Sequence, residues 1–288
     1  MSDVLGDDDV MIDVAGATAS SGIGIVCDAG ERARVLLGKQ VLFGPLDPCG
    51  ECDVCRRGGA AVCPLARRRD AIGAHVVAAA RWVVTLGDGL ELPVPAGAAV
   101  AGDVATAYTM YARTGIGPRE LTVVLGFSPV ARFLVEILLA KSVTPAVVVE
   151  PERGGWCDWL LSRGAVVARV ARGASDADAR QTVAATLAAL EGAPTNRPWR
   201  VLATTGDAVP RAAALAGPRA TLTVLAPSPP LPGDLAAREV TVIGVAGAHP
   251  DLVVEAAAMC VKREVDLAAG TTQEDRPDSA CSRVVVPR

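Results

Sequence analysis

Histidine and aromatic residues are scarce in this sequence. Among its 288 residues histidine occurs twice, as His75 and His249, so imidazole chemistry has only two candidates. His75 falls in an expected strand and His249 directly precedes an expected helix at Pro250, which favours packing or capping roles for both. Aromatic residues make up 3% of the chain. Alanine, valine, leucine and glycine must therefore fill the core, and they suit close packing of helices on a sheet.

An excess of positive charge and long apolar runs are also lacking. The net charge is -4 and the segment MSDVLGDDDV is acidic, which argues against nucleic acid or an anionic membrane as a partner. The most apolar stretch, PVARFLVEILLA, contains Arg132 and Glu136 and is too short to span a bilayer. No stretch reads as a signal peptide. The sequence therefore predicts a cytoplasmic protein, and clustered cysteines in that compartment bind metal more often than they form disulfides.

The later part of the chain has the pattern of an α/β domain. From Leu121 onward, short β-branched runs alternate with longer segments that carry apolar residues at helical spacing. This alternation predicts a doubly wound parallel sheet of Rossmann type, covered by helices. The expected strands are 121–127, 145–150, 165–170, 199–206, 220–226 and 239–247. The expected helices are 129–141, 155–164, 175–192, 209–217 and 250–267.

The first hundred residues have a different pattern. Short β-rich segments punctuated by glycine come first, and the first long helix is expected at 103–115. We therefore expect a small β domain over residues 1–100, a Rossmann-type domain over 101–270 and a tail over 271–288. One interpretation of the tail is that its short strand, SRVVVPR, returns to the β domain. The expected strands of the β domain are 9–16, 22–30, 39–45 and 74–86.

Four cysteines lie in one short loop, CGECDVCRRGGAAVC, at residues 49–63. The spacing lets three thiolates wrap one ion from a tight turn while the fourth closes a tetrahedron, which is typical of a structural zinc site. Gly50, Gly58 and Gly59 supply the backbone freedom that such a turn needs. The predicted ligands are Cys49, Cys52, Cys55 and Cys63.

Two other interpretations of the cysteine loop remain open. A bacterial ferredoxin has three similarly spaced cysteines and a Cys-Pro, and Cys63-Pro64 is similar to that, although the last gap of a ferredoxin is shorter. The remaining cysteines are scattered singly, which disfavours an iron–sulfur cluster. Reduced thiols without a metal are the second alternative. The spacing favours one structural zinc over both.

With a β domain that carries this loop and a Rossmann-type domain after it, the sequence resembles the zinc-dependent medium-chain alcohol dehydrogenases. Within that family it is most similar to the 6-hydroxycyclohex-1-ene-1-carbonyl-CoA dehydrogenases. Supporting stretches are DDDVMIDVAG, GAHVVAAARWVV, GDVATAYTMYARTGIGP, LTVVLGF and VVVEPE. The resemblance implies a GroES-like β domain, a nicotinamide cofactor, a second, catalytic zinc, and a homo-oligomer formed through the edge strand at 239–247.

The residues at the positions of the family's catalytic zinc are altered. The family's first ligand is a cysteine after an early V-A-G strand, and the matching residue here is Ala17. Its G-H-E-x-x-G motif corresponds to ASSGIG, with Ser20 and Ser21 in place of His and Glu. Alanine offers no lone pair and serine hydroxyls are poor zinc ligands. Asp103, the one remaining candidate ligand, cannot hold zinc alone. The sequence therefore predicts that the catalytic zinc is missing.

The nucleotide fingerprint is altered too. In GFSPVA, Gly126 matches the first glycine of the fingerprint, Ser128 replaces the second and Ala131 occupies the third. Ser128 adds a side chain where phosphates come closest, and Pro129 removes one N–H from the helix start. Glu150 ends the second strand, where a carboxylate accepts the ribose hydroxyls of NAD. The alternative interpretation is that Glu150 is a solvated loop carboxylate without a role in binding. NAD binding is therefore doubtful.

A cluster of arginines gives the cysteine loop a basic face within an acidic protein. A solvated face is the usual reading of such a run, and contact with an acidic partner or a phosphate-bearing ligand such as a coenzyme A ester is the alternative. The arginines are Arg56, Arg57, Arg67, Arg68 and Arg69.

Three hypotheses about function follow. The favoured one is a dehydrogenase scaffold that has kept its structural zinc, lost its active site, and works as a binding or assembly subunit, as a homo-oligomer or within a larger complex. The alternative is an NAD-dependent alcohol or hydroxyacyl-CoA dehydrogenase. A zinc-independent reductase similar to the quinone oxidoreductases is disfavoured, because those enzymes need NADPH and Glu150 repels its extra phosphate.

Overall fold

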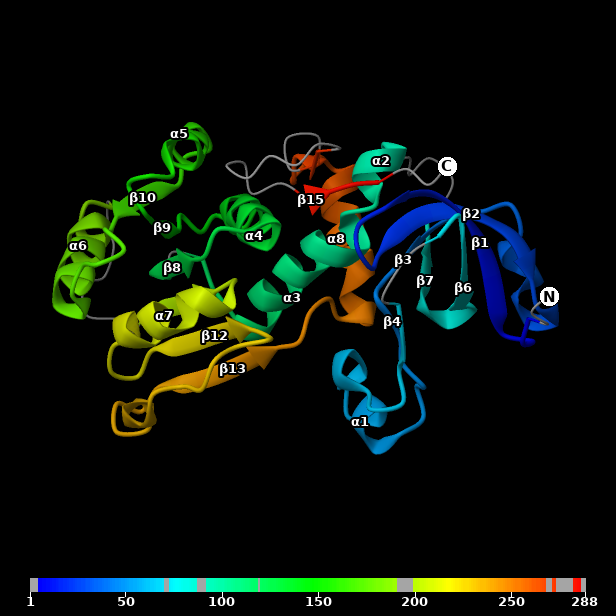
Figure 1. Ribbon diagram of the computed structural model, residues 1–288, viewed down its shortest axis with the longest axis horizontal. Helices are drawn as coiled ribbons and strands as arrows, with labels where there is room; N and C mark the ends of the chain where they lie inside the picture. Colours follow the sequence, from blue (N-terminus) through cyan, green and yellow to red (C-terminus); the bar gives the residue numbers. More distant parts are fainter. Residues whose placement is uncertain are drawn as a thin grey trace. The chain divides into compact units, whose positions relative to one another are not determined.

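A computed structural model describes residues 5–69, 73–86, 92–118, 120–190, 199–267, 271–272 and 282–285. The chain divides into two compact units (Figure 1). The first comprises Met1–Tyr108, Gly247–Asp275 and Ser282–Arg288, and Thr109–Ala246 form the body of the second. Residues 247–267, which the sequence-based boundaries gave to the Rossmann-type domain, thus belong with the β-rich unit.

The first unit is built on a curled, five-stranded antiparallel sheet in the order β6-β1-β2-β3-β7, consistent with a GroES-like domain. Apolar side chains alternate along its strands, so one face is buried. Val10 and Ile12 of β1 pack with Val26, Val41 and Phe43 of the neighbouring strands, and all five are at most 1% exposed. The strands are β1 Asp9–Ala17, β2 Gly22–Ala29, β3 Gln40–Phe43, β6 His75–Ala79 and β7 Val83–Thr85.

Short helices and two small sheets complete the first unit. The helix expected at 103–115 begins instead as a π-helical turn, η4 at Val100–Val104, and continues as α3 at Ala105–Thr114, whose residues from Thr109 onward belong to the second unit. Helix α8 packs against η4. A bridge between Ala17 and Val285 returns the tail to β1, with both backbone hydrogen bonds formed. The other elements are η1 Glu31–Leu36, β4 Leu46–Asp47, α1 Asp53–Arg56, η2 Ala60–Val62, β5 Arg67–Arg68, η3 Ala80–Trp82, α2 Val94–Gly97, η7 Pro250–Leu252, α8 Val253–Val261, β14 Thr271–Thr272 and β15 Ser282–Arg283.

The second unit contains a parallel six-stranded sheet in the order β10-β9-β8-β11-β12-β13. In chain order this is 3-2-1-4-5-6, the arrangement of a Rossmann fold, and it confirms the predicted fold class. The chain reverses its direction of winding between β8 and β11, which creates the crevice where such folds bind ligands. The strands are β8 Thr122–Leu125, β9 Ala146–Val149, β10 Val166–Arg169, β11 Arg200–Ala203, β12 Thr221–Leu225 and β13 Thr241–Val245.

Helices cover both faces of this sheet (Figure 1). Because parallel crossovers are right-handed, α4 and α5 lie on one face, and the return from β10 to β11 places α6 and α7 on the other. Val183 of α6 and Leu215 of α7 pack on Val123 and Val201 in one buried cluster. The helices are α4 Pro129–Ala140, α5 Gly154–Ser162, α6 Asp176–Ala188 and α7 Val209–Leu215, with the short η5 Gly206–Ala208 and η6 Gly233–Leu235.

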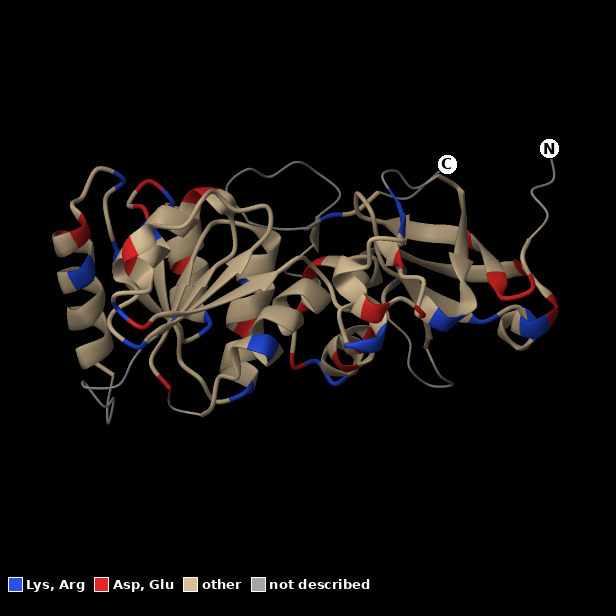
Figure 2. Cartoon of the chain, turned by 90° about the horizontal axis from the view of Figure 1, so that it is seen from below, with Lys and Arg blue, Asp and Glu red and all other residues tan. Residues whose placement is uncertain are grey.

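Acidic and basic residues are interspersed along the ribbon of each unit (Figure 2). Within the described residues, no helix is both long enough and apolar enough to cross a bilayer. Strand β13 lies at an edge of its sheet, as the sequence predicts, and pairs only with β12 among the described strands.

Candidate functional site

The cysteine loop is a compact lobe that leaves and rejoins the first unit through a pair of short strands. Strands β4 and β5 pair antiparallel, with Asp47 opposite Arg67, and close the base of the lobe. Cys52 is the N-cap of α1, and its sulfur accepts a hydrogen bond from the N–H of Cys55. The backbone of α1 therefore helps to position the Cys52 and Cys55 thiols.

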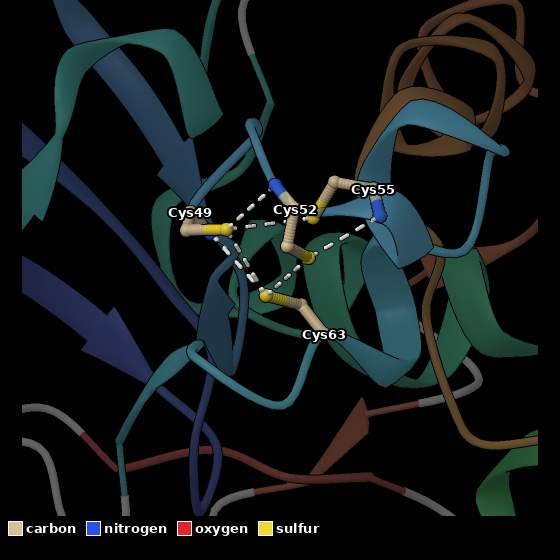
Figure 3. Close-up of side chains that lie close together, drawn as sticks. All are labelled: Cys49, Cys52, Cys55 and Cys63. Carbon is tan, nitrogen blue, oxygen red and sulfur yellow. Dashed lines mark hydrogen bonds between the residues drawn. The ribbon is translucent and has the colours of Figure 1, made fainter.

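The four sulfurs of the lobe converge on one point (Figure 3). All four lie within 4.8 Å of one another, and three pairs measure 4.0 Å for Cys49–Cys55, 3.9 Å for Cys52–Cys63 and 3.6 Å for Cys49–Cys63. Zn–S bonds of about 2.3 Å in a tetrahedron separate neighbouring sulfurs by roughly 3.8 Å. The observed spacing matches such a tetrahedron and is far longer than a disulfide bond of about 2.05 Å.

Backbone N–H groups favour the thiolate form of one ligand. The N–H groups of Glu51 and Cys52 point at the Cys49 sulfur, and these hydrogen bonds lower the pKa of the Cys49 thiol to about 6. A further N–H···S bond of 3.4 Å joins the Cys49 backbone to the Cys63 sulfur. Hydrogen bonds of this kind stabilise negative charge on sulfur, which is the form that binds zinc.

Glycines permit the turns of the lobe, as the sequence predicts. Gly50 and Gly58 have φ angles of +75° and +79°, a region that side chains disfavour. Gly59 has an ordinary φ of -94°, but an added Cβ would lie 2.8 Å from the side chain of Val54. All three glycines are therefore required, the first two for backbone conformation and the third for close packing.

Three hydrogen bonds tether the lobe to the rest of the first unit. The indole of Trp82 donates to the Pro48 carbonyl at 2.6 Å, and the guanidinium of Arg81 donates to the Cys49 carbonyl. His249 is the N-cap residue of η7, yet its ring makes no cap hydrogen bond. Instead its Nε2–H donates to the Gly58 carbonyl at 2.9 Å. His249 thus has a structural role that connects the lobe to the segment before α8.

The arginines near the lobe are largely paired within the protein. Asp47 has 5% of its side chain exposed and accepts hydrogen bonds from Arg67 and Arg69, while Arg69 has 7% exposed and also donates to the Gly44 carbonyl. Arg56 pairs with the exposed Asp53. Three of the five arginines therefore have partners inside the chain, and Arg69 is part of the core rather than of a basic face.

Hydroxyl groups occupy the region around Ser21. Ser21 is fully buried, and its Oγ lies 2.7 Å from the Oγ1 of Thr18 and donates to the Ala98 carbonyl at 3.3 Å. Gly102 of η4 packs so closely that any side chain there would collide with the Ser21 hydroxyl. Ala17 is buried at the end of β1 with only a methyl group. The side chains at this position are thus small, and the Ser21 hydroxyl is engaged inside the chain.

The turn after β8 is stabilised by its own side chains. Gly126 has a φ of +107°, and a side chain there would collide with Thr204. Ser128 is the N-cap of α4, where its Oγ accepts the N–H of Ala131 at 3.1 Å and donates to Thr204 at 3.2 Å. Pro129 has no N–H to offer. The donors at the helix start are thus partly used inside the chain.

A cavity of about 560 Å³ opens at the carboxyl ends of β8, β9 and β10. Its lining includes Gly126, Phe127, Trp156 and Arg211. Glu150 also lines it, but both carboxylate oxygens are held by Arg172, at 2.9 and 3.1 Å. The Arg172 guanidinium lowers the pKa of Glu150 below its ordinary value. This volume lies within the range of small-molecule sites, about 300–1,000 Å³.

No protein-family model matches the sequence, and no curated protein matches it either. Solved structures do match the fold. Galactitol-1-phosphate dehydrogenase from Escherichia coli superposes with a TM-score of 0.82 over 100% of this chain and 95% of that one, at 15% identity. Alcohol dehydrogenase TADH from Thermus sp. ATN1 gives 0.78 over 99% and 94%, at 16% identity. An alcohol dehydrogenase from Escherichia coli CFT073, complexed with NADH, gives 0.78 over 98% and 93%, at 12% identity.

The fold is that of the zinc-dependent medium-chain alcohol dehydrogenases. The family resemblance inferred from the sequence is confirmed at this level. The narrower likeness to the 6-hydroxycyclohex-1-ene-1-carbonyl-CoA dehydrogenases stays a prediction.

Proteins of this alcohol dehydrogenase-like fold can hold a structural and a catalytic zinc, and the donor groups present decide which of the two sites this chain can form. The four thiols of the lobe fit a structural zinc in number, type and spacing. Ala17, Ser20 and Ser21 offer a methyl group and two hydroxyls, which do not fit a zinc ion. Asp103 lies in η4 and belongs to neither group of three or more potential ligands found among the described residues.

Sequence reasoning missed two partners in these sites. Arg172, which is exposed, pairs with Glu150. The two residues follow the neighbouring parallel strands β10 and β9, and only this pairing of the strands brings them together. Asp47 reads as an ordinary loop carboxylate before Pro48, yet it is the buried acceptor for two arginines. The three arginines at 67–69 were the available hint, because a buried arginine requires an acidic partner.

Proposed function

We propose that this chain is a zinc-stabilised protein of alcohol dehydrogenase-like fold that does not transfer hydride and serves as a binding or assembly subunit. The observation that carries the proposal is the packing around Ser21, whose hydroxyl is buried and hydrogen-bonded to Thr18 and Ala98. Oxidation of an alcohol on this fold requires a group that polarises the hydroxyl. Ala17, Ser20 and Ser21 supply no thiolate, imidazole or carboxylate, and the single carboxylate of Asp103 cannot hold zinc alone.

The cleft of the second unit supports the same proposal. The Ser128 hydroxyl accepts the Ala131 N–H, a donor that would otherwise be free for phosphate oxygens. Glu150 is held by Arg172 through two hydrogen bonds. A nicotinamide dinucleotide needs both the phosphate turn and the ribose carboxylate. Its binding would therefore require breaking these internal contacts.

The cavity beside Glu150 remains available for a small molecule. Phe127 and Trp156 meet edge to face, with ring centroids 5.8 Å apart, and the Arg153 guanidinium lies 4.1 Å from the Phe127 ring centroid. Such aromatic and cationic groups suit a flat base with an attached phosphate. We therefore include a coenzyme A-type or other adenosine-containing compound among the ligands to be tested.

An NAD-dependent oxidoreductase is the second candidate. It is favoured by Glu150, which lines the cavity at the end of β9 where the fold places a ribose-binding carboxylate. If a cofactor displaces Arg172 from Glu150, this carboxylate becomes available to the ribose hydroxyls.

Titration of NADH, NADPH and coenzyme A into the zinc-loaded chain separates the two candidates. We expect no saturable NADH or NADPH fluorescence change and no reduction of NAD by a panel of alcohols and hydroxyacyl-CoA esters. The double variant Ser128→Gly with Arg172→Gln should bind NADH more tightly than the original chain. Arg169→Gln, an exposed arginine outside the cavity, should not. Micromolar NADH binding by the original chain would instead support the oxidoreductase.

A further inference from the structure

Three potential metal ligands meet on the exposed face of the first sheet, away from the cysteine lobe. Asp13 lies on β1, Cys27 on β2 and His75 on β6, and each is exposed. One ligand atom from each residue lies within 4.8 Å of the others. Among the described residues, this group and the lobe are the two clusters of three or more potential ligands.

The strand register brings these residues together. Asp13 is paired directly with His75 across β1 and β6, and the Asp13 Oδ1 lies 2.7 Å from the His75 Nδ1. On β2, the register shifts between Met11 and Ile12, so Cys27 is an extra residue that has no pairing partner on β1. A β-bulge of this kind re-aims a side chain and often lies beside a functional site.

The bulge turns Cys27 toward the other two residues. Its thiol donates to the Met11 carbonyl at 3.5 Å, on the strand that also carries Asp13. All three side chains therefore project from paired strands, and little backbone freedom would be lost when they converge on an ion. This rigidity distinguishes the cluster from acidic residues gathered on a loop.

We propose that Asp13, Cys27 and His75 bind a divalent transition metal of the zinc class. A thiolate, an imidazole and a carboxylate are the three ligand types that proteins use for zinc. Three protein ligands leave one tetrahedral position for water or an outside group. The site therefore differs in kind from the lobe, whose four thiolates close the coordination shell.

The surrounding charge favours a cation. Within the described residues, the ion pair of Asp13 is with His75, and no lysine or arginine pairs with it. Asp28 follows Cys27 and is exposed, which adds negative charge beside the site. The cluster is also separate from the buried end of β1, because Ala17 lies four residues beyond Asp13, roughly 13 Å along the strand.

Metal binding is tested with the full chain, its lobe already loaded with zinc. The chain is dialysed against micromolar free Zn²⁺, and elemental analysis then gives the number of zinc ions bound per chain. In a second measurement Co²⁺ is added to the zinc-loaded chain, and its binding is followed by the thiolate-to-cobalt charge-transfer absorption. We expect two metal ions per chain. Cys27→Ser and His75→Gln should each bind only the lobe zinc. The metal affinity of the second site should fall by about 100-fold or more in each variant, which exceeds the 10–100-fold loss typical when a residue that only hydrogen-bonds a metal ligand is replaced.

Asp28→Asn is the matched control, since it removes one exposed carboxylate beside the site without removing a proposed ligand. It should retain two ions and the cobalt absorption. One ion per original chain would overturn the proposal. So would a second ion that persists in both Cys27→Ser and His75→Gln, or an equal loss in Asp28→Asn. Circular dichroism confirms that each variant is folded, and the two ligand variants at different strands test the site independently.

Discussion

Replacement of Cys52 by serine tests the role of the lobe most directly. Cys52 supplies one of the four sulfurs and also caps α1 through its N–H···S bond with Cys55. A hydroxyl is a poor zinc ligand beside three thiolates. We therefore expect Cys52→Ser to lose the lobe zinc. The backbone of residues 49–63 would then lack the metal cross-link between its four cysteine positions.

The size of the effect follows from the contacts that an unfolded lobe would give up. The hydrogen bonds from Trp82, Arg81 and His249 end on lobe carbonyls. At about 0.5–1.5 kcal/mol each, their loss lowers the free energy of unfolding of the first unit by about 3 kcal/mol. For a domain of this size that corresponds to roughly 6–12 °C in melting temperature.

Elemental analysis and calorimetry measure the two consequences. With both chains treated with a strong chelator, the original chain should melt at the temperature of Cys52→Ser, because neither then holds a metal ion. Cys157→Ala removes a buried thiol from the second unit and should leave the lobe zinc in place. A Cys52→Ser chain that keeps its lobe zinc and its melting temperature would refute the structural role of the lobe.

Three further changes have defined outcomes. Asp47→Asn leaves the buried Arg69 without its charged partner and should destabilise the chain by about 3–5 kcal/mol in urea unfolding; a change near zero would show that water replaces the carboxylate. Arg172→Gln should raise the pKa of Glu150 in carboxyl NMR titrations. Because Arg172 depresses that pKa, any stabilisation by this exposed pair exists above the unfolded pKa and disappears as the pH falls through the folded one. Val242→Lys places a charge on edge strand β13 and should convert the proposed homo-oligomer to monomers in light scattering; a monomeric original chain would contradict this expectation.

The sequence predicted the elements whose determinants are local. Each of the six strands of the second sheet was recognisable as a β-branched run. A central strand such as β8 is apolar along its length because both of its faces are covered. The lobe was equally visible, since its four ligands fall within fifteen residues. The helix at 253–261 was predicted as a helix but assigned to the Rossmann-type domain. The apolar pattern of this helix shows that one of its faces must be buried, but it does not show which unit the helix packs against.

Contacts between distant strands could not be predicted in the same way. Asp13, Cys27 and His75 lie on three different strands, and Cys27 faces the other two only because of a bulge. Nothing in the alternation of β2 marks that bulge, since one extra residue in a strand leaves no distinctive composition. The engagement of Glu150 by Arg172 likewise depends on which strands are neighbours at the sheet edge.

The discontinuous first unit has a consequence for biosynthesis. Its sheet is complete by Thr85, but α8 and the Val285 bridge to β1 come after the whole second unit. At a translation rate of about 5–20 residues per second, roughly 10–30 s separate the emergence of Thr85 from that of Gly247. During that interval the first unit lacks α8, the helix that packs against η4, while the strands of the second unit are being synthesised. The first unit can therefore complete its packing only after the strands of the second unit have been made.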